Sequence, residues 1–255
     1  MVHLTAAVVY NSKPSYAKTT IEEKINECNK LIRCYKEEHG IPGIVVAVSQ
    51  NGETIYNKGF GYSDVENLIR ANSNTIMRIA SISKPITCTI AAILYENGKL
   101  DFDKSISSYL NDLPLKVKYI TSRQLMSHSS GIRHYKEISY DKNETNDYEF
   151  LSNKEFKTTI EALEIFINDE LKFEPGKGHL YTTYGFTLLS AVLEKANGNK
   201  PIGKMLEELF KTLEMNDTYL DLNCPVVSKL SLCIDCYFVI EIIFVIFTFS
   251  FIEFF

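Results

Sequence analysis

The first patterned stretch of the chain is amphipathic. Apolar residues fall on one helical face over residues 21–38, and Thr20 stands where it can cap that helix. Gly40 then ends it. Residues 44–62 form two runs rich in β-branched and aromatic residues about a central Asn51-Gly52, the strongest short sequence signal for a hairpin. The pattern therefore predicts a helix followed by two antiparallel strands.

Helical periodicity dominates the middle of the chain. It predicts four longer helices, at residues 81–97, 157–168, 183–197 and 202–213. Residues 101–110 are expected to form a short helix or a loop, and 121–127 another short element. The polar, turn-rich residues 136–153 indicate a surface loop. One hairpin among several helices is typical of an α+β (α/β) fold, with an antiparallel sheet packed by helices and an all-helical region.

The two ends of the chain differ from the middle. Residues 1–20 hold two lysines, no acidic residue and no arginine, a weak form of a mitochondrial targeting sequence. Residues 237–252 are almost wholly apolar and rich in Ile, Val and Phe. They could be a marginal membrane anchor, a pair of buried strands, or sequence foreign to the domain before them. We favour the third, and expect an N-terminal segment, a partial domain at 21–229 and an atypical apolar tail at 230–255.

Composition and charge narrow the function classes. The chain is 45% hydrophobic and 23% charged, as in an ordinary globular protein, and its net charge of −5 gives no reason to expect a nucleic-acid partner. The six cysteines are not spaced like a secreted disulfide framework. Cys28 is expected to be a buried thiol on the first helix. Cys233 and Cys236 form a lone CxxC without a second pair, so no metal is expected there.

Candidate chemistry begins with a Ser-x-x-Lys pattern at Ser81 and Lys84. The same spacing occurs twice more in the chain, but only Ser81 opens a strongly apolar helix. Positions three apart share a helical face, so the Lys84 amine can reach the Ser81 oxygen. Unpaired N–H groups at a helix start also favour negative charge on that oxygen. The alternative is a plain capping serine beside a surface lysine.

A tyrosine stands just before the helix predicted at 183–197. A cation beside a phenol favours the phenolate form, so Tyr181 placed next to Lys84 could act as a general base and acid. The alternative is a core tyrosine whose hydroxyl bonds to the backbone.

Three segments together resemble a known family. RIASISKPIT (78–87), ITSRQLMSHSSGIRHY (120–135) and FEPGKGHLYTTYGFTLLSAVLE (173–194) are similar to the serine β-lactamase-related proteins. These include class C β-lactamases, penicillin-binding proteins and related serine peptidases and esterases. SHSSGIRHY and YTTYGFTLL are most similar to the animal mitochondrial β-lactamase-like serine proteases. With the hairpin, the resemblance covers residues 21–225.

The resemblance implies a β-lactamase/transpeptidase-like fold and a serine hydrolase of the peptidase or esterase type, without metal or cofactor. Ser81 would be the acyl-forming nucleophile, Lys84 its proton partner, and Tyr181 the general base and acid. Thr183 stands where many relatives have Asn and would contact the substrate, a peptide or an ester. The mitochondrial relatives imply a mitochondrial location and a link to lipid metabolism. A homo-oligomer, and membrane contact through the tail, are left open.

Four histidines lie within the resembling region. His128, in SHSSG, is expected to belong to the scaffold, and His134, in GIRHY, is typical of the family without an assigned role. His39 and His179 are expected at the surface.

One family element is missing from the sequence. No Lys-Thr-Gly or His-Thr-Gly string follows Tyr181, although the family carries one on a late strand that completes the oxyanion hole. One oxyanion donor lowers the activation free energy by about 3–4 kcal/mol. We therefore expect a C-terminally truncated member that lacks the late strands and whose activity is in doubt. The alternative function is a catalytically inactive fragment or scaffold, such as a subunit of an assembly.

Overall fold

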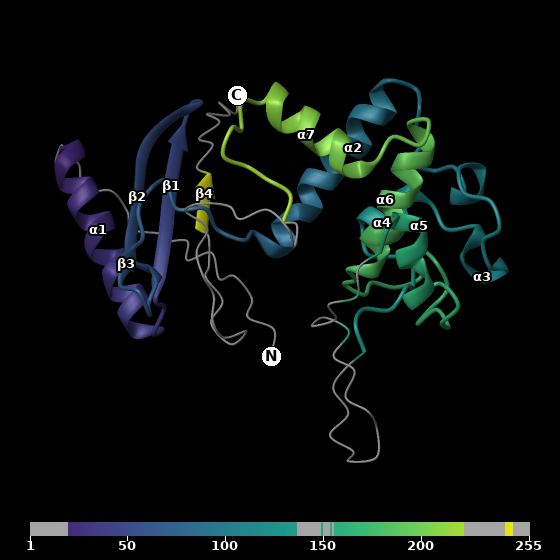
Figure 1. The fold of residues 1–255 in the computed structure, drawn as a ribbon, viewed down its shortest axis with the longest axis horizontal. Coiled ribbons are helices and arrows are strands. Elements are labelled where there is room, and N and C mark those ends of the chain that lie inside the picture. The colour runs from purple at the N-terminus through teal and green to yellow at the C-terminus, as the bar shows by residue number, and fades with distance from the viewer. Residues whose placement is uncertain (1–19, 137–148, 150–153, 155, 222–242, 247–255) are drawn as a thin grey trace, which may run out of the picture. The chain divides into compact units, whose positions relative to one another are not determined.

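The computed structural model describes residues 20–136, 149, 154, 156–221 and 243–246. The chain divides into two compact units, the first comprising Met1–Arg78 with Val226–Phe255 and the second Ile79–Pro225. Figure 1 labels α-helices and strands of both units.

The first unit is a helix packed on a small sheet. Helix α1 (Ile21–Glu38) begins at a capping box in which Thr20 and Glu23 satisfy each other's backbone N–H groups. Strands β1 (Gly43–Gln50) and β2 (Glu53–Asp64) form the predicted antiparallel hairpin. Its turn residues Asn51 and Gly52 have φ values of 53° and 82°, as such a tight turn requires.

Two further strands complete this sheet. β3 (Ile69–Arg70) pairs with β2, and β4 (Ile243–Ile246) runs parallel to β1, giving the order β3-β2-β1-β4. The remainder of the tail at 230–255 lies outside the described residues. Its interpretation as foreign sequence therefore stays a prediction.

The core of the first unit lies between α1 and the hairpin. Four apolar residues of the strands are buried there: Ile44, Val46, Tyr56 and Phe60. Cys28 packs against this cluster from the apolar face of α1, as expected, but it is half-buried instead of buried.

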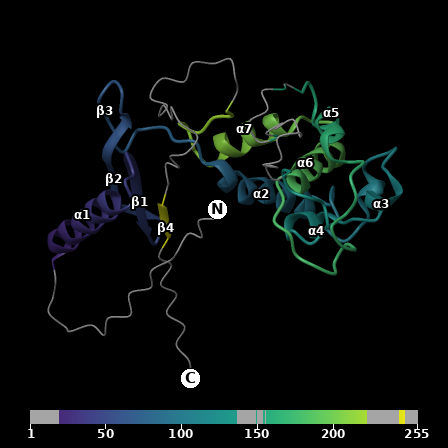
Figure 2. The ribbon, with the colours of Figure 1, turned by 90° about the horizontal axis from the view of Figure 1, so that it is seen from below.

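The second unit is helical. It contains a 3₁₀ turn, η1 (Ala80–Ile82), leading into α2 (Ser83–Glu96), and then several short elements: η2 (Ile106–Ser108), α3 (Leu115–Lys118), α4 (Ser122–Met126), α5 (Thr159–Ala162) and η4 (Leu163–Ile165). It ends with α6 (Tyr184–Ala196) and α7 (Ile202–Thr212). Figures 1 and 2 both show α6 beside α4 and α5, and α6 also contacts α2 and α7.

Helix α6 is the centre of this unit because it is apolar on nearly every side. Leu188, Leu189, Val192 and Leu193 are each 0% exposed. Such an apolar helix must be buried by its neighbours over most of its surface, and here, over residues 184–194, only Thr187, Ser190 and Glu194 are partly exposed. This central position holds the first turn of α6 firmly against the elements around it.

The helical boundaries differ from the expectation at two places. Helix 81–97 begins with the 3₁₀ turn η1, so Ser81 precedes the α-helix instead of capping it. The single helix expected at 157–168 is divided into the short α5 and η4, because the chain tightens there to bury Leu163 and Phe166. Most of the surface loop expected at 136–153 lies outside the described residues.

None of the described helices is both long enough and apolar enough to cross a membrane. The CxxC at 233–236 lies outside the described residues, and the three described cysteines, Cys28, Cys34 and Cys88, are free thiols.

Candidate active site

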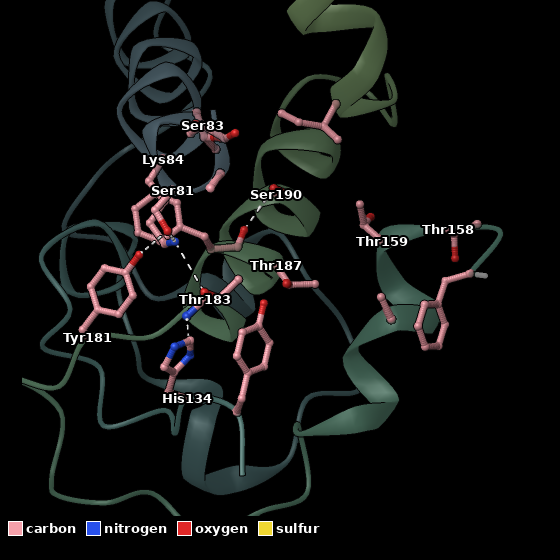
Figure 3. A pocket seen from close by; sticks show the side chains of 17 residues that line it. Ser81, Ser83, Lys84, His134, Thr158, Thr159, Tyr181, Thr183, Thr187 and Ser190 are labelled. Carbon is pink, nitrogen blue, oxygen red and sulfur yellow. Dashed lines mark hydrogen bonds between the residues drawn. The ribbon is translucent and has the colours of Figure 1, made fainter. Parts of the chain in front are cut away.

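A cleft of about 700 Å³ opens in the second unit. Its walls come from the start of α2, the segment before α6, the outer face of α6, and the start of α5 (Figure 3). Ser81, Lys84, Tyr181 and Thr183, the site residues expected from the sequence, all line it. The structure therefore brings the four together in one place.

Ser81 and Lys84 are joined across one helical turn. Lys84 Nζ donates a hydrogen bond to Ser81 Oγ at 3.0 Å. Ser81 itself is exposed, in the 3₁₀ turn that precedes α2. Ala80, just before it, has a φ of +42°, a left-handed conformation that costs energy for a residue with a side chain. Such strain presents the serine hydroxyl to the cleft instead of folding it into a helix cap.

Tyr181 approaches the same oxygen from the other side. Its hydroxyl hydrogen-bonds to Ser81 Oγ at 2.6 Å (Figure 3). The Lys84 ammonium also lies 4.7 Å from the centre of the Tyr181 ring, a cation–π distance. Ser81 Oγ is thus contacted at once by an amine and a phenol.

Thr183 lies on the opposite side of the lysine. Its Oγ1 is 3.4 Å from Lys84 Nζ, at the limit of a hydrogen bond, and it occupies the N-cap position of α6. Lys84 therefore lies between the Ser81 and Thr183 hydroxyls, as the dashed lines of Figure 3 show.

The segment that carries Tyr181 is held by main-chain hydrogen bonds to the loop after α4. Leu180 N–H donates to the carbonyl of His128 at 2.9 Å, and Gly176 N–H to that of Ser129 at 2.8 Å. Gly131 has a φ of +78°, and a Cβ there would lie 2.2 Å from the carbonyl oxygen of Phe173. The two loops can approach so closely only because residue 131 is glycine.

Thr182 anchors this segment in the interior. It is fully buried, its hydroxyl donates to the carbonyl of Arg133 at 2.6 Å, and it accepts from Gly185 N–H at 3.1 Å. Its neighbours Tyr181 and Thr183 face the cleft instead. An inward hydroxyl thus sets the position of two cleft residues.

A buried ion network supports Arg133. The guanidinium donates to both oxygens of Glu149, at 2.8 and 3.0 Å, and to Asp169 at 2.5 Å. The Tyr184 hydroxyl also donates to Glu149, at 2.9 Å. Burial would raise the pKa of Glu149, but the hydrogen bonds from Arg133, Lys136 and Tyr184 outweigh it and lower that pKa. Burial and the Glu149 carboxylate raise the pKa of Tyr184. Glu149 is therefore held as a carboxylate.

Two histidines touch the same segment. His128 Nδ1 accepts the N–H of Thr182 at 3.1 Å, and His134 Nδ1 accepts that of Thr183 at 3.3 Å. His134 also lines the cleft. Sequence reasoning left His134 without a role, and only its place in GIRHY hinted at one. His39 and His179 are exposed, as expected.

The side chains that line the cleft carry little charge. Among the residues that line it, Lys84 is the cation and none is a carboxylate. Within the part of the chain that the structure describes, no group of three or more His, Cys, Asp or Glu side chains is placed to hold a metal ion.

Known proteins resemble this chain in sequence. The family model described as Beta-lactamase matches residues 28–229. The human protein "Serine beta-lactamase-like protein LACTB, mitochondrial" is 35% identical, over 80% of this chain and 48% of its own length. The chain thus spans about half the length of the curated relatives it matches.

Solved structures resemble it in fold. An octameric penicillin-binding protein homologue from Pyrococcus abyssi has a TM-score of 0.62 at 26% identity, covering 75% of this chain and 43% of that one. A class C beta-lactamase has a TM-score of 0.65 at 22% identity, covering 82% of this chain and 54% of that one. The expected β-lactamase/transpeptidase-like fold is confirmed, and the chain belongs to the beta-lactamase family.

Proposed function

We propose that this chain carries the acylating centre of a serine hydrolase that acts on peptides or esters. The observation that carries the proposal is the double contact at Ser81 Oγ, with Lys84 Nζ at 3.0 Å and the Tyr181 hydroxyl at 2.6 Å. A serine hydroxyl is a weak nucleophile until a neighbouring group takes its proton. Here two groups able to do so are within hydrogen-bonding distance.

The reaction is an acyl transfer in two halves. Ser81 Oγ attacks the substrate carbonyl while its proton passes to the Lys84–Tyr181 pair, one member of which is in its basic form. The same proton then passes to the leaving amine or alcohol as the acyl-enzyme forms. Water then attacks the acyl carbonyl and loses a proton to the pair. The bond to Ser81 Oγ breaks, the acid leaves, and the pair returns the proton to Ser81. Tyr181, exposed at the cleft, is the member placed to reach the leaving group.

Thr183 is proposed to contact the substrate. It faces the cleft and keeps a hydroxyl next to Lys84. The resemblance implies that many relatives have an Asn here, whose amide donates and accepts through two separate atoms, whereas Thr183 does both through one hydroxyl on a shorter side chain. We expect this difference to alter how the substrate's amide or ester group is held.

The relatives support a proposal for the location of this chain and one for its assembly. The human, bovine and mouse relatives are described as mitochondrial, which supports a mitochondrial location for this chain. The octameric Pyrococcus abyssi homologue supports a homo-oligomer. The link to lipid metabolism stays a prediction.

A second candidate function is a catalytically inactive scaffold. It is favoured by the sequence, which has no Lys-Thr-Gly or His-Thr-Gly after Tyr181 to supply the second oxyanion donor. The two functions differ in one measurable respect, since only the hydrolase forms a covalent bond through Ser81.

The test is covalent labelling of the full chain with a fluorophosphonate probe, with the modified peptide identified by mass spectrometry. We expect modification at Ser81 and its loss in Ser81→Ala. Ser108→Ala, which removes an exposed hydroxyl outside the cleft, is the matched control and is expected to be labelled like the wild type. A chain that unfolds cooperatively in urea, and is therefore folded, yet takes up no probe would establish the scaffold instead.

A further inference from the structure

Two consecutive peptide N–H groups at residues 182 and 183 donate hydrogen bonds to histidine rings. Thr182 N–H donates to His128 Nδ1 at 3.1 Å, and Thr183 N–H donates to His134 Nδ1 at 3.3 Å. The rings come from the loop after α4, about 50 positions earlier in the chain. Together they hold the Tyr181–Thr183 stretch, which leads into α6. We refer to His128 and His134 as the imidazole pair.

These contacts define the protonation state of both rings. A nitrogen that accepts a hydrogen bond from a peptide N–H carries no proton itself, so each imidazole is neutral and protonated at Nε2. An imidazolium has N–H groups at both positions. Protonation of either ring would therefore set one donor against another and break the contact.

The surroundings favour the neutral form. Burial and the nearby Lys84 ammonium lower the pKa of both His128 and His134, and for His128 the neighbouring His179 and His134 add to the effect. Within the described residues, the other titratable groups in ring contact with the pair are Tyr181, whose ring centre lies 4.6 Å from that of His128 and 5.4 Å from that of His134, and Tyr135, stacked on His134 at 4.4 Å. The described part of their own loop also carries Arg133, which donates to the carbonyl of His134 and is paired with Glu149 and Asp169, and Lys136, which lies 4.0 Å from Glu149.

The stretch that the pair holds carries the contacts of the nucleophile. Tyr181 begins this stretch and bonds to Ser81 Oγ, and Thr183 ends it and faces Lys84 Nζ. A shift of this stretch by one ångström would lengthen the 2.6 Å contact beyond a good hydrogen bond. The imidazole pair thus acts on the nucleophile through the backbone, without touching the reacting atoms.

We propose that His128 and His134 are positioning residues of the active site, which hold the Tyr181–Thr183 stretch only while both rings are neutral and release it on protonation. The inference rests on the proposed function for its kinetic consequence, but its structural content does not. The fall of the activity at low pH then follows the protonation of these two rings. Above their titration range the stretch is held and Ser81 is activated; below it, activity is lost.

Replacing each histidine of the pair by asparagine tests the hydrogen bond separately from the protonation of the ring. The side-chain oxygen of asparagine occupies nearly the place of a histidine Nδ1 and accepts a hydrogen bond at every pH. We expect His128→Asn and His134→Asn to keep most of the Ser81 labelling rate at pH 7.5, whereas the corresponding alanine variants lose it throughout. A single titrating group lowers a rate by about tenfold per pH unit, and two together approach about a hundredfold. Each Asn variant should therefore make the acid limb of the wild type less steep.

The matched control is His39→Asn, an exposed histidine at the end of α1, in the other unit. It should leave the acid limb unchanged. If the His128→Asn and His134→Asn variants keep the wild-type acid limb, the proposal is wrong. The same holds if the alanine variants, folded by urea unfolding, label as fast as the wild type.

A second measurement does not depend on activity. In the full chain labelled with ¹⁵N-histidine, two rings should show the neutral form protonated at Nε2 and should keep it below the ordinary histidine pKa of about 6.5. Rings protonated at Nδ1 would overturn the proposal even in an active protein. Absence of probe labelling, with the expected tautomers present, would overturn the proposed function and leave the positioning role standing.

Discussion

The phenol oxygen of Tyr181 lies 2.6 Å from Oγ of Ser81, although the two residues are 100 positions apart in the chain. The contact exists because the start of α2 and the segment before α6 converge on one cleft. Lys84 completes the arrangement by contacting the serine oxygen and the face of the tyrosine ring. Each contact can be removed separately.

Removal of the Tyr181 hydroxyl should uncouple chemistry from folding. Tyr181→Phe keeps the ring over Lys84 but loses the hydroxyl that we propose transfers the proton, so the labelling rate at Ser81 is expected to fall by about 10²- to 10⁴-fold. Because Tyr181 is 40% exposed, the free energy of unfolding should change by less than about 1 kcal/mol. Tyr119→Phe, at an exposed tyrosine outside the cleft, should change neither quantity. An unchanged labelling rate in Tyr181→Phe would remove tyrosine from the mechanism.

Lys84 is expected to be needed for more than its charge. Lys84→Arg keeps a cation near Tyr181, but a guanidinium does not give up its proton in proteins and cannot serve as a base. We expect Lys84→Arg and Lys84→Met both to lower the labelling rate by at least about a hundredfold. Lys204→Met, at an exposed lysine of α7, serves as control and should label normally. Full activity of Lys84→Arg would show that the lysine acts only as a charge.

The ion pair between Arg133 and Glu149 makes a pH-dependent contribution to stability. The folded state lowers the pKa of Glu149 below its usual 4.5, so the unfolded chain takes up that proton first as the pH falls. The stabilisation is complete above about pH 4.5 and is lost as the pH drops through the folded-state pKa. Glu149→Gln removes this carboxylate and should make the urea midpoint less sensitive to acid.

At neutral pH, Glu149→Gln should cost about 3 kcal/mol of unfolding free energy, because both side chains of the pair are largely buried. Glu207→Gln, in an exposed pair with Lys204, should cost less than about 1 kcal/mol. Equal losses in the two variants would contradict a special role for the buried network.

Two glycines offer a matched comparison of backbone strain and close approach. Gly131 and Gly98 both have positive φ, at +78° and +67°, but a Cβ would meet the Phe173 carbonyl at 2.2 Å only at Gly131. Gly98→Ala should cost about 1–2 kcal/mol from the backbone conformation alone. Gly131→Ala should cost clearly more and also slow labelling at Ser81, since it separates the loops that place Tyr181. Urea unfolding and probe kinetics on both variants would reveal any failure of this order.

Local signals were sufficient for the elements whose stability is local. The Thr20 cap, the apolar face of α1 and the Asn51-Gly52 turn each act within a few residues, and the structure has them where the sequence predicts. The Ser-x-x-Lys spacing likewise predicts a contact within one helical turn, and that contact is present.

Apart from the approach of Tyr181 to Ser81, which the family resemblance implied, contacts between distant segments were not foreseen. His134 meets Thr183 across 49 positions, and Arg133 meets Asp169 across 36, so no periodicity or spacing signals either contact. The break between α5 and η4 also follows from burial of Leu163 and Phe166 under neighbouring elements. Helical propensity alone does not contain that information.

The inward direction of Thr182 has a consequence for altering this protein. Because a buried hydroxyl anchors the stretch that bears Tyr181 and Thr183, the reacting groups are set by the interior. The far wall of the cleft, with Thr158, Thr159 and Ala162, belongs to a different element. Under the proposed function, new substrate preferences can therefore be sought by redesigning that wall, while the contacts around Ser81 are left intact.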